Sequence, residues 1–135
     1  MTEADMKQTI KELTTGIQHL GLPTACYEET LAFYQGLGFE ILWQATDRKC
    51  TFLRLGEAVI ETYSAEEVHP VWGAWDHVAL NVTDIDHVYT EIKAAGYRFA
   101  QGEDGPIFLP FFENGVKFFT IIGPNNEKLE FNQIL

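Results

Sequence analysis

The sequence is poor in basic residues, with nine Lys and Arg against 20 Asp and Glu and a formal net charge of -11. Nucleic acids and anionic membrane surfaces are bound through clustered cations that displace counterions. We therefore expect neither nucleic acid nor a membrane as a partner. A large net negative charge is typical of a protein that stays dispersed in solution, and it indicates no specific electrostatic role.

Cysteines and long apolar runs are also scarce. Cys26 and Cys50 are isolated and lack CxxC spacing, so the sequence predicts two free thiols rather than a disulfide framework or a zinc knuckle. No run of roughly 18 apolar residues could span a bilayer. The N-terminus lacks the basic start and apolar middle of a signal peptide. These features predict a cytoplasmic protein.

Aromatic residues, by contrast, are plentiful: ten Phe, five Tyr and three Trp in 135 residues predict one compact folded unit. Residues 3–13 place Met6, Ile10 and Leu13 on one helical stripe. The simplest expectation is that this helix packs on its own domain, although the stripe would also suit a partner.

The sequence contains an internal repeat. A shift of 58 residues superimposes His19 on His77 and Gly38 on Gly96. The first copy predicts a strand at 17–22, a helix at 28–37 and strands at 39–44, 51–55 and 58–63; the second predicts a strand at 76–82, a helix at 85–95 and strands near 97–100, 116–122 and 128–134.

Two copies of one βαβββ unit predict an α+β fold in which the copies are related by a pseudo-twofold axis and form a cupped mixed β-sheet. We expect an N-terminal helix at 1–16, a first module at 17–64, a linker at 65–75 and a second module at 76–135. The 101–115 loop is the main length difference between the copies.

Strand alternation places a histidine on the same face of each copy. His19 shares a face with Ile17 and Gly21, opposite Leu20 and Leu22. In the stretch DHVALNV, His77 likewise lies opposite the aliphatic side chains. Glu61 and Glu130 occupy later strands with similar alternation. Two imidazoles and two carboxylates form an N2O2 set suited to a divalent transition ion.

Other notable side chains carry weaker predictions. We expect His69 and His87 to be solvated surface residues. Trp72 and Trp75 flank the junction of the copies and either fill a seam or line a pocket, with the seam favoured. Three aromatics of the 101–115 loop suggest a pocket wall or a dimer contact: Phe108, Phe111 and Phe112.

The motifs HLGL, FYQGLGFE, AVIETY, DHVALNV and GPNNEKLEF together resemble the vicinal oxygen chelate (glyoxalase, bleomycin resistance and dioxygenase) superfamily over residues 17–133. The resemblance implies that His19, Glu61, His77 and Glu130 bind one divalent metal ion per site (Ni, Zn, Co, Mn or Fe). Because both glutamates are present, the glyoxalase I type fits best.

That resemblance implies a metal-dependent lyase or isomerase in which a carboxylate moves a proton through a metal-bound enediolate. Glu130 is the first candidate for the base, with Glu61 serving the other face. Pro23 and Ala65 stand where bacterial glyoxalase I has its glutathione-binding arginine and asparagine, although a one-residue gap would bring Ser64 into the second position. The resemblance therefore implies the metal chemistry more strongly than a glutathione adduct.

Other activities of the superfamily remain open: thiol transferase, epimerase, dioxygenase, or binding of a drug or other small molecule without turnover. A small-molecule substrate and a homodimer are the partners that the resemblance implies.

Overall fold

The computed structural model describes residues 2–73 and 75–135. The first module contains β1 (Leu20–Thr24), α2 (Tyr27–Gly36), β2 (Glu40–Gln44), β3 (Cys50–Leu55) and β4 (Ala58–Ser64). Its sheet has the order β1-β4-β3-β2, in which β1 pairs parallel to β4 and the other neighbours are antiparallel. The predicted order of one strand, one helix and three strands is confirmed.

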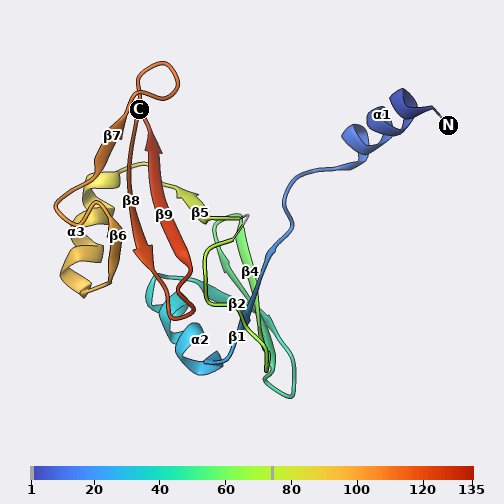
Figure 1. Ribbon diagram of the computed structural model, residues 1–135, viewed down its shortest axis with the longest axis horizontal. Helices are drawn as coiled ribbons and strands as arrows, with labels where there is room; N and C mark the ends of the chain where they lie inside the picture. Colours follow the sequence, from blue (N-terminus) through green and yellow to red (C-terminus); the bar gives the residue numbers. More distant parts are fainter. Residues whose placement is uncertain (1, 74) are drawn as a thin grey trace.

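The second module repeats this arrangement with β5 (His77–Asn81), α3 (Ile85–Ala95), β6 (Phe99–Gln101), β8 (Val116–Ile122) and β9 (Lys128–Ile134). Its sheet has the order β5-β9-β8-β6, and β5 is parallel to β9. A short strand, β7 (Ile107–Leu109), adds to β8. The fold is thus α+β with two mixed sheets (Figure 1).

Most predicted boundaries are within a few residues of the observed ones. Helix α3 begins where Asp84 caps it, because the Asp84 carboxylate accepts a hydrogen bond from the backbone N–H of His87. It ends at Gly96, which adopts the left-handed conformation with φ of 81°. Two predictions were wrong: the first strand begins at Leu20 rather than Ile17, and β7 lies inside the segment predicted as a loop.

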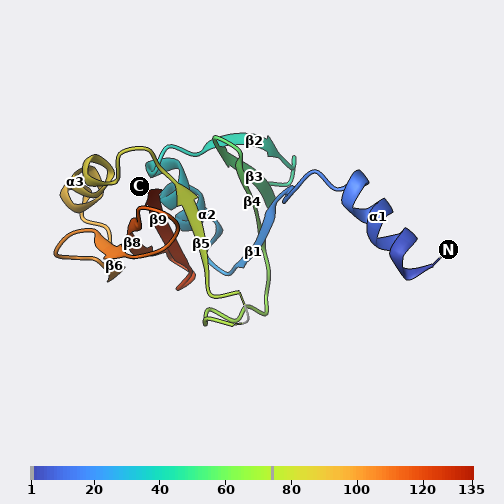
Figure 2. The same cartoon turned by 90° about the horizontal axis from the view of Figure 1, so that it is seen from above.

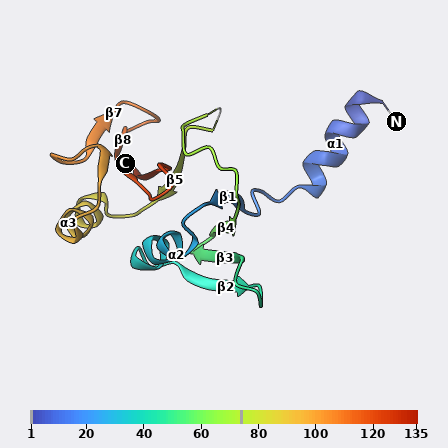
Figure 3. The same ribbon diagram turned by 60° about the horizontal axis from the view of Figure 1, so that its bottom comes forward.

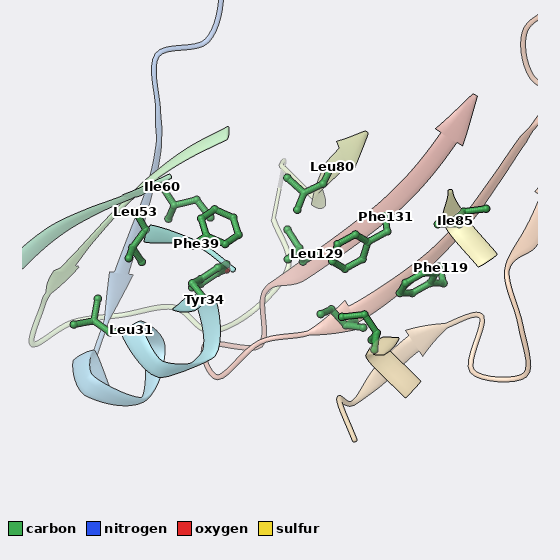
Figure 4. Close-up of a cluster of buried hydrophobic side chains, with 12 residues drawn as sticks. Leu31, Tyr34, Phe39, Leu53, Ile60, Leu80, Ile85, Phe119, Leu129 and Phe131 are labelled. Carbon is green, nitrogen blue, oxygen red and sulfur yellow. The ribbon is translucent and has the colours of Figure 1, made fainter. Parts of the chain in front are cut away.

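The hydrophobic core joins the two modules. Figure 3 shows α2 beside the sheet of β1 to β4, and Figure 4 shows Tyr34 of α2 on the side that faces Leu129 of β9. Leu31 and Tyr34 of α2 belong to one buried cluster with Leu129 and Phe131 of β9. Burying these apolar faces is the main stabilising contribution, roughly 25 cal/mol for each Å² removed from water.

A polar network also links the modules at the turn before β9. Asn125 accepts a hydrogen bond from the Thr24 hydroxyl at 2.7 Å and donates to the Thr30 hydroxyl at 2.9 Å. The Tyr34 hydroxyl donates to Glu127 at 3.0 Å. Burial, followed by the charge of Glu127, raises the pKa of Tyr34 well above its ordinary value. These bonds fix the position of the first module relative to the β8–β9 turn.

Helix α1 (Glu3–Leu13) does not pack on its own domain, so that expectation was wrong. It extends away from both sheets, on the opposite side of the molecule from α3 (Figures 1 and 2). None of its residues is buried, and Leu13 is 78% exposed. Its local stability comes from a capping box between Thr2 and Asp5. None of the helices in the described parts of the chain is long and apolar enough to cross a membrane.

Candidate metal site

The first histidine and glutamate lie side by side on one sheet. His19 comes directly before β1, and Glu61 of β4 is the register partner of Gly21 in the parallel β1–β4 ladder. The Nε2 atom of His19 is 3.4 Å from Oε1 of Glu61. The ring of Phe52, the register partner of Glu61 on β3, meets the imidazole edge-on at 5.3 Å. We call His19 and Glu61 the first His–Glu pair.

The second module builds the same pair in the same register. His77 begins β5, and Glu130 of β9 is the register partner of Ala79, two residues after the histidine. The Nε2 atom of His77 is 3.5 Å from Oε1 of Glu130. We call these residues the second His–Glu pair. The predicted alternation is confirmed, because Leu129 and Phe131, on either side of Glu130, are buried in the core.

Each histidine is oriented by the residue before it. Nδ1 of His19 is 3.0 Å from the amide oxygen of Gln18, and Nδ1 of His77 is 2.9 Å from the carboxylate of Asp76. Both oxygens only accept hydrogen bonds, so each Nδ1 carries the proton. In the neutral rings, Nε2 then has a lone pair directed toward the glutamate, which is the tautomer that a metal ligand needs.

This arrangement fits a divalent ion. A lone pair on Nε2 and a carboxylate oxygen repel each other unless positive charge lies between them, and either a proton on Nε2 or a metal ion supplies that charge. With metal–ligand bonds of about 2.0–2.1 Å, a tetrahedral ion separates neighbouring ligand atoms by about 3.3 Å. The observed separations of 3.4 and 3.5 Å are close to this value.

The acceptors behind the two histidines differ in charge. Asp76 forms an ion pair with Lys128 at 3.2 Å, and the Lys128 ammonium lies 3.7 Å from the centre of the Trp72 ring. The hydrogen bond from His77, followed by that from Lys128, lowers the pKa of Asp76. Gln18 is neutral. The imidazole of the second pair therefore donates to a carboxylate, and that of the first pair donates to an amide oxygen.

The glutamates are also held by different donors. The Cys50 thiol lies 3.5 Å from Oε2 of Glu61, whereas the Asn132 amide donates to Oε2 of Glu130 at 3.0 Å. Burial, followed by the hydrogen bond to Glu61, raises the pKa of Cys50, which keeps the thiol protonated. The Glu130 side chain is 12% exposed and that of Glu61 27%.

The two pairs do not meet within one chain. In residues 2–73 and 75–135, no three His, Cys, Asp or Glu side chains are grouped closely enough to hold an ion together. The structure thus brings His19 to Glu61 and His77 to Glu130, but it does not assemble the four residues that the sequence suggested as one set.

A cavity of about 620 Å³ is lined by residues of both modules, including both histidines. Trp72 and Trp75 line it and are 50% and 91% exposed, so they do not fill a seam as favoured from the sequence. Pro23 and His69 also border this cavity.

Two further predictions concern surface residues. His87 is exposed and lies 3.5 Å from Glu91 on the same helix, which confirms its surface position. The three aromatics of the 101–115 segment are exposed within this chain: Phe108, Phe111 and Phe112.

Sequence reasoning missed the residues that orient the two pairs. Gln18 and Asp76 precede their histidines directly, and each carries an oxygen acceptor, so the repeat contained a signal for them. Cys50 and Asn132 gave no such signal. Their roles depend on which strands are neighbours and on side-chain conformation, and neither follows from periodicity.

A comparison with protein families identifies the family, and a comparison with solved structures identifies the fold. The sequence profile of the Glyoxalase/Bleomycin resistance protein/Dioxygenase superfamily matches residues 16–108. No curated protein sequence matches the chain.

Solved structures with the same fold include a glyoxalase/bleomycin resistance protein/dioxygenase from Alicyclobacillus acidocaldarius, with 18% identity, coverage of 90% of this chain and 92% of that one, and a TM-score of 0.71. A lactoylglutathione lyase from Agrobacterium tumefaciens has 16% identity, 89% and 94% coverage and a TM-score of 0.68. A bleomycin resistance determinant encoded on the transposon Tn5 has 22% identity, 88% and 98% coverage and a TM-score of 0.67. At these identities the likeness establishes the fold.

The sequence profile covers most of the chain, and the two βαβββ modules supply the matching architecture. The chain therefore belongs to the Glyoxalase/Bleomycin resistance protein/Dioxygenase superfamily.

Proposed function

We propose that this protein is a metal-dependent, glyoxalase I-like lyase or isomerase whose ligands are His19, Glu61, His77 and Glu130. One observation carries the proposal: the chain builds the same His–Glu pair twice, in the same register, with Nε2 to Oε1 separations of 3.4 and 3.5 Å. Two imidazoles and two carboxylates suit Ni, Zn, Co, Mn or Fe as the divalent ion.

The proposal requires two copies of the chain. Because neither pair alone completes an N2O2 set, the first pair of one copy joins the second pair of another in a symmetric homodimer. Large apolar side chains exposed within one chain support this assembly, since such surfaces mark interaction sites. Trp43 of the edge strand β2 is 56% exposed, and the α1 stripe is also free to contact a partner.

In the proposed reaction the two glutamates divide the proton chemistry. Glu130 takes the proton from one carbon of the substrate and returns it to the neighbouring carbon, while Glu61 serves the opposite face. The Asn132 amide holds Oε2 of Glu130 and leaves Oε1 facing His77. A divalent ion held by these four residues would supply positive charge to stabilise the negative charge that develops on the substrate oxygens.

The substrate is proposed as a small hemithioacetal or keto compound rather than a glutathione adduct. Pro23 carries no charge with which to bind a glutathione carboxylate, and it lies in β1 beside the cavity. The indole rings of Trp72 and Trp75 provide apolar walls instead. A cytoplasmic location belongs to the same proposal.

The test is metal-dependent turnover. Purified protein is stripped with a chelator, reloaded with each candidate ion and assayed for consumption of hemithioacetals formed from methylglyoxal with glutathione or with 2-mercaptoethanol. We expect activity only after reloading, with the 2-mercaptoethanol adduct consumed at least as well as the glutathione adduct. Absence of turnover of either adduct by metal-loaded protein contradicts the proposed reaction. Glu130→Gln is the catalytic control.

A second candidate function is small-molecule binding without turnover, which the aromatic-lined cavity between the modules favours. The two functions differ in their need for metal. A binder would retain its ligand after chelation and in Glu61→Gln, whereas the proposed enzyme loses both metal and activity. Oxygen uptake with a catechol would instead indicate a dioxygenase.

A further inference from the structure

Each glutamate of the two pairs has one oxygen beside a histidine and the other beside a hydrogen-bond donor. In the first pair, Oε1 of Glu61 faces His19 and Oε2 lies 3.5 Å from the Cys50 sulfur. In the second, Oε1 of Glu130 faces His77 and Oε2 accepts from Asn132 at 3.0 Å. The repeat therefore preserves a donor at Oε2 although the donating groups differ chemically.

The donors also come from different strands. Cys50 of β3 is the register partner of Tyr63, which lies two residues after Glu61. The equivalent partners in the second module are Phe118 of β8 and Asn132, which lies two residues after Glu130. Donor and aromatic ring have thus exchanged strands between the modules. Residues on different strands thus donate to the equivalent oxygen of each glutamate. What the two modules share is a donor at this oxygen, not the residue that supplies it.

We propose that Cys50 is a positioning residue of the metal site, whose thiol holds Oε2 of Glu61 and thereby presents Oε1 to the space beside Nε2 of His19. This inference rests on the proposed function, because it concerns how a ligand of the same site is oriented. A carboxylate that is not held can rotate away from the ion, and outer partners that prevent rotation contribute to metal affinity.

The thiol makes the first pair the less firmly held of the two. An S–H group is a weak donor, whereas an amide N–H is an ordinary one. Glu61 is also more exposed than Glu130, with side-chain exposures of 27% and 12%, so water competes more for its oxygens. Loss of the Cys50 contact should therefore leave Glu61 free to rotate, whereas the lower exposure of Glu130 also restricts its side chain.

The first experiment measures metal affinity directly. Wild-type protein, Cys50→Ala, Cys50→Ser and Cys26→Ser are titrated with Co²⁺ and with Zn²⁺ in competition with a chelating dye. We expect Cys50→Ala to bind about 10-fold more weakly, at the low end for an outer partner. Cys50→Ser retains a donor and should restore most of the affinity. Cys26→Ser should match wild type, because Cys26 contacts Thr24, Thr30 and Asn125 and not Glu61.

The second experiment needs no metal. Cys26→Ser leaves Cys50 as the only thiol, and its S–H stretching band is recorded by infrared spectroscopy in metal-free protein. Donation to a carboxylate lowers the frequency of this band. We expect a lowered frequency that rises when Glu61→Leu is added, and a band at the free-thiol frequency before that substitution overturns the contact.

The outcomes separate the two proposals. If wild-type protein binds no divalent ion, the proposed function fails and the positioning role fails with it, while the S–H band still reports whether the contact exists. If wild-type protein binds metal and Cys50→Ala binds it equally well, the positioning role of Cys50 is overturned and the proposed function stands.

Discussion

The two modules place the same two side chains in the same register and surround them differently. The second pair is backed by the Asp76 carboxylate and an amide donor, and Glu130 is only 12% exposed. The first pair is backed by the Gln18 amide and a thiol, and Glu61 is 27% exposed. Duplication of a fold thus fixes where the His and Glu side chains lie, while their electrostatic surroundings change independently.

This difference predicts that the two pairs contribute unequally to metal affinity. A carboxylate behind a histidine strengthens the imidazole as a ligand, so the second pair should anchor the ion. The first pair should complete the proposed ligand set, with a neutral amide and a weak thiol donor as its hydrogen-bond partners.

Removing a ligand should have the largest effect. His77→Ala and His19→Ala each eliminate one nitrogen of the N2O2 set, and we expect metal affinity to fall by more than about 100-fold in both, since even outer partners cost roughly 10- to 100-fold. Competition titration with a chelating dye measures this. If His19→Ala binds metal as tightly as wild type, the site involves the second module alone.

Changing the acceptor behind each histidine should have a smaller and unequal effect. Asp76→Asn keeps an oxygen acceptor and removes the charge, and we expect affinity to fall by about 10-fold or more. Gln18→Leu removes a neutral acceptor and should lower the metal affinity by a smaller factor. The same titration compares them, and an equal or larger loss in Gln18→Leu would show that the charge behind His77 does not set the difference.

At the boundary between the modules, Asn125→Leu should reduce the free energy of unfolding by about 1–3 kcal/mol, because it leaves the Thr24 and Thr30 hydroxyls without their amide partner. Urea unfolding measures this loss. The exposed Asn114 of the 101–115 segment provides the matched control, and Asn114→Ala should change stability little. A small effect of Asn125→Leu would mean that apolar packing alone fixes the modules.

The raised pKa of Tyr34 predicts that the free energy of unfolding falls at alkaline pH. Its pKa in the folded protein lies above the ordinary value of 10.0, so the unfolded chain loses the phenolic proton first as pH rises. The stabilising contribution is therefore complete below pH 10.0 and decreases as pH rises from there toward the folded pKa. Unfolding measured across this range should show a smaller pH-dependent loss in Tyr34→Phe; identical slopes would contradict this assignment.

Much of this organisation could be predicted from the sequence. The 58-residue repeat identified both histidines and the strand, helix and strands of each module, because residue alternation and helix caps are local signals. The helix predicted at 85–95 has these bounds in the structure.

The position of α1 and the separation of the two pairs could not be predicted in the same way. An apolar stripe such as Met6, Ile10 and Leu13 indicates that a helix buries one face, but not against which molecule. The tertiary arrangement of two modules likewise decides whether His19 and His77 share a site within one chain. Both questions depend on long-range packing.

We propose that each metal site takes its first His–Glu pair from one chain and its second from another. The direct measurement uses two inactive proteins, His19→Ala with Glu61→Ala and His77→Ala with Glu130→Ala, unfolded together, refolded and analysed for bound metal. Each mixed dimer then contains one intact site, so random mixing should restore about a quarter of the wild-type metal content. No recovery in the mixture, with wild type refolded in parallel binding metal normally, would contradict the claim.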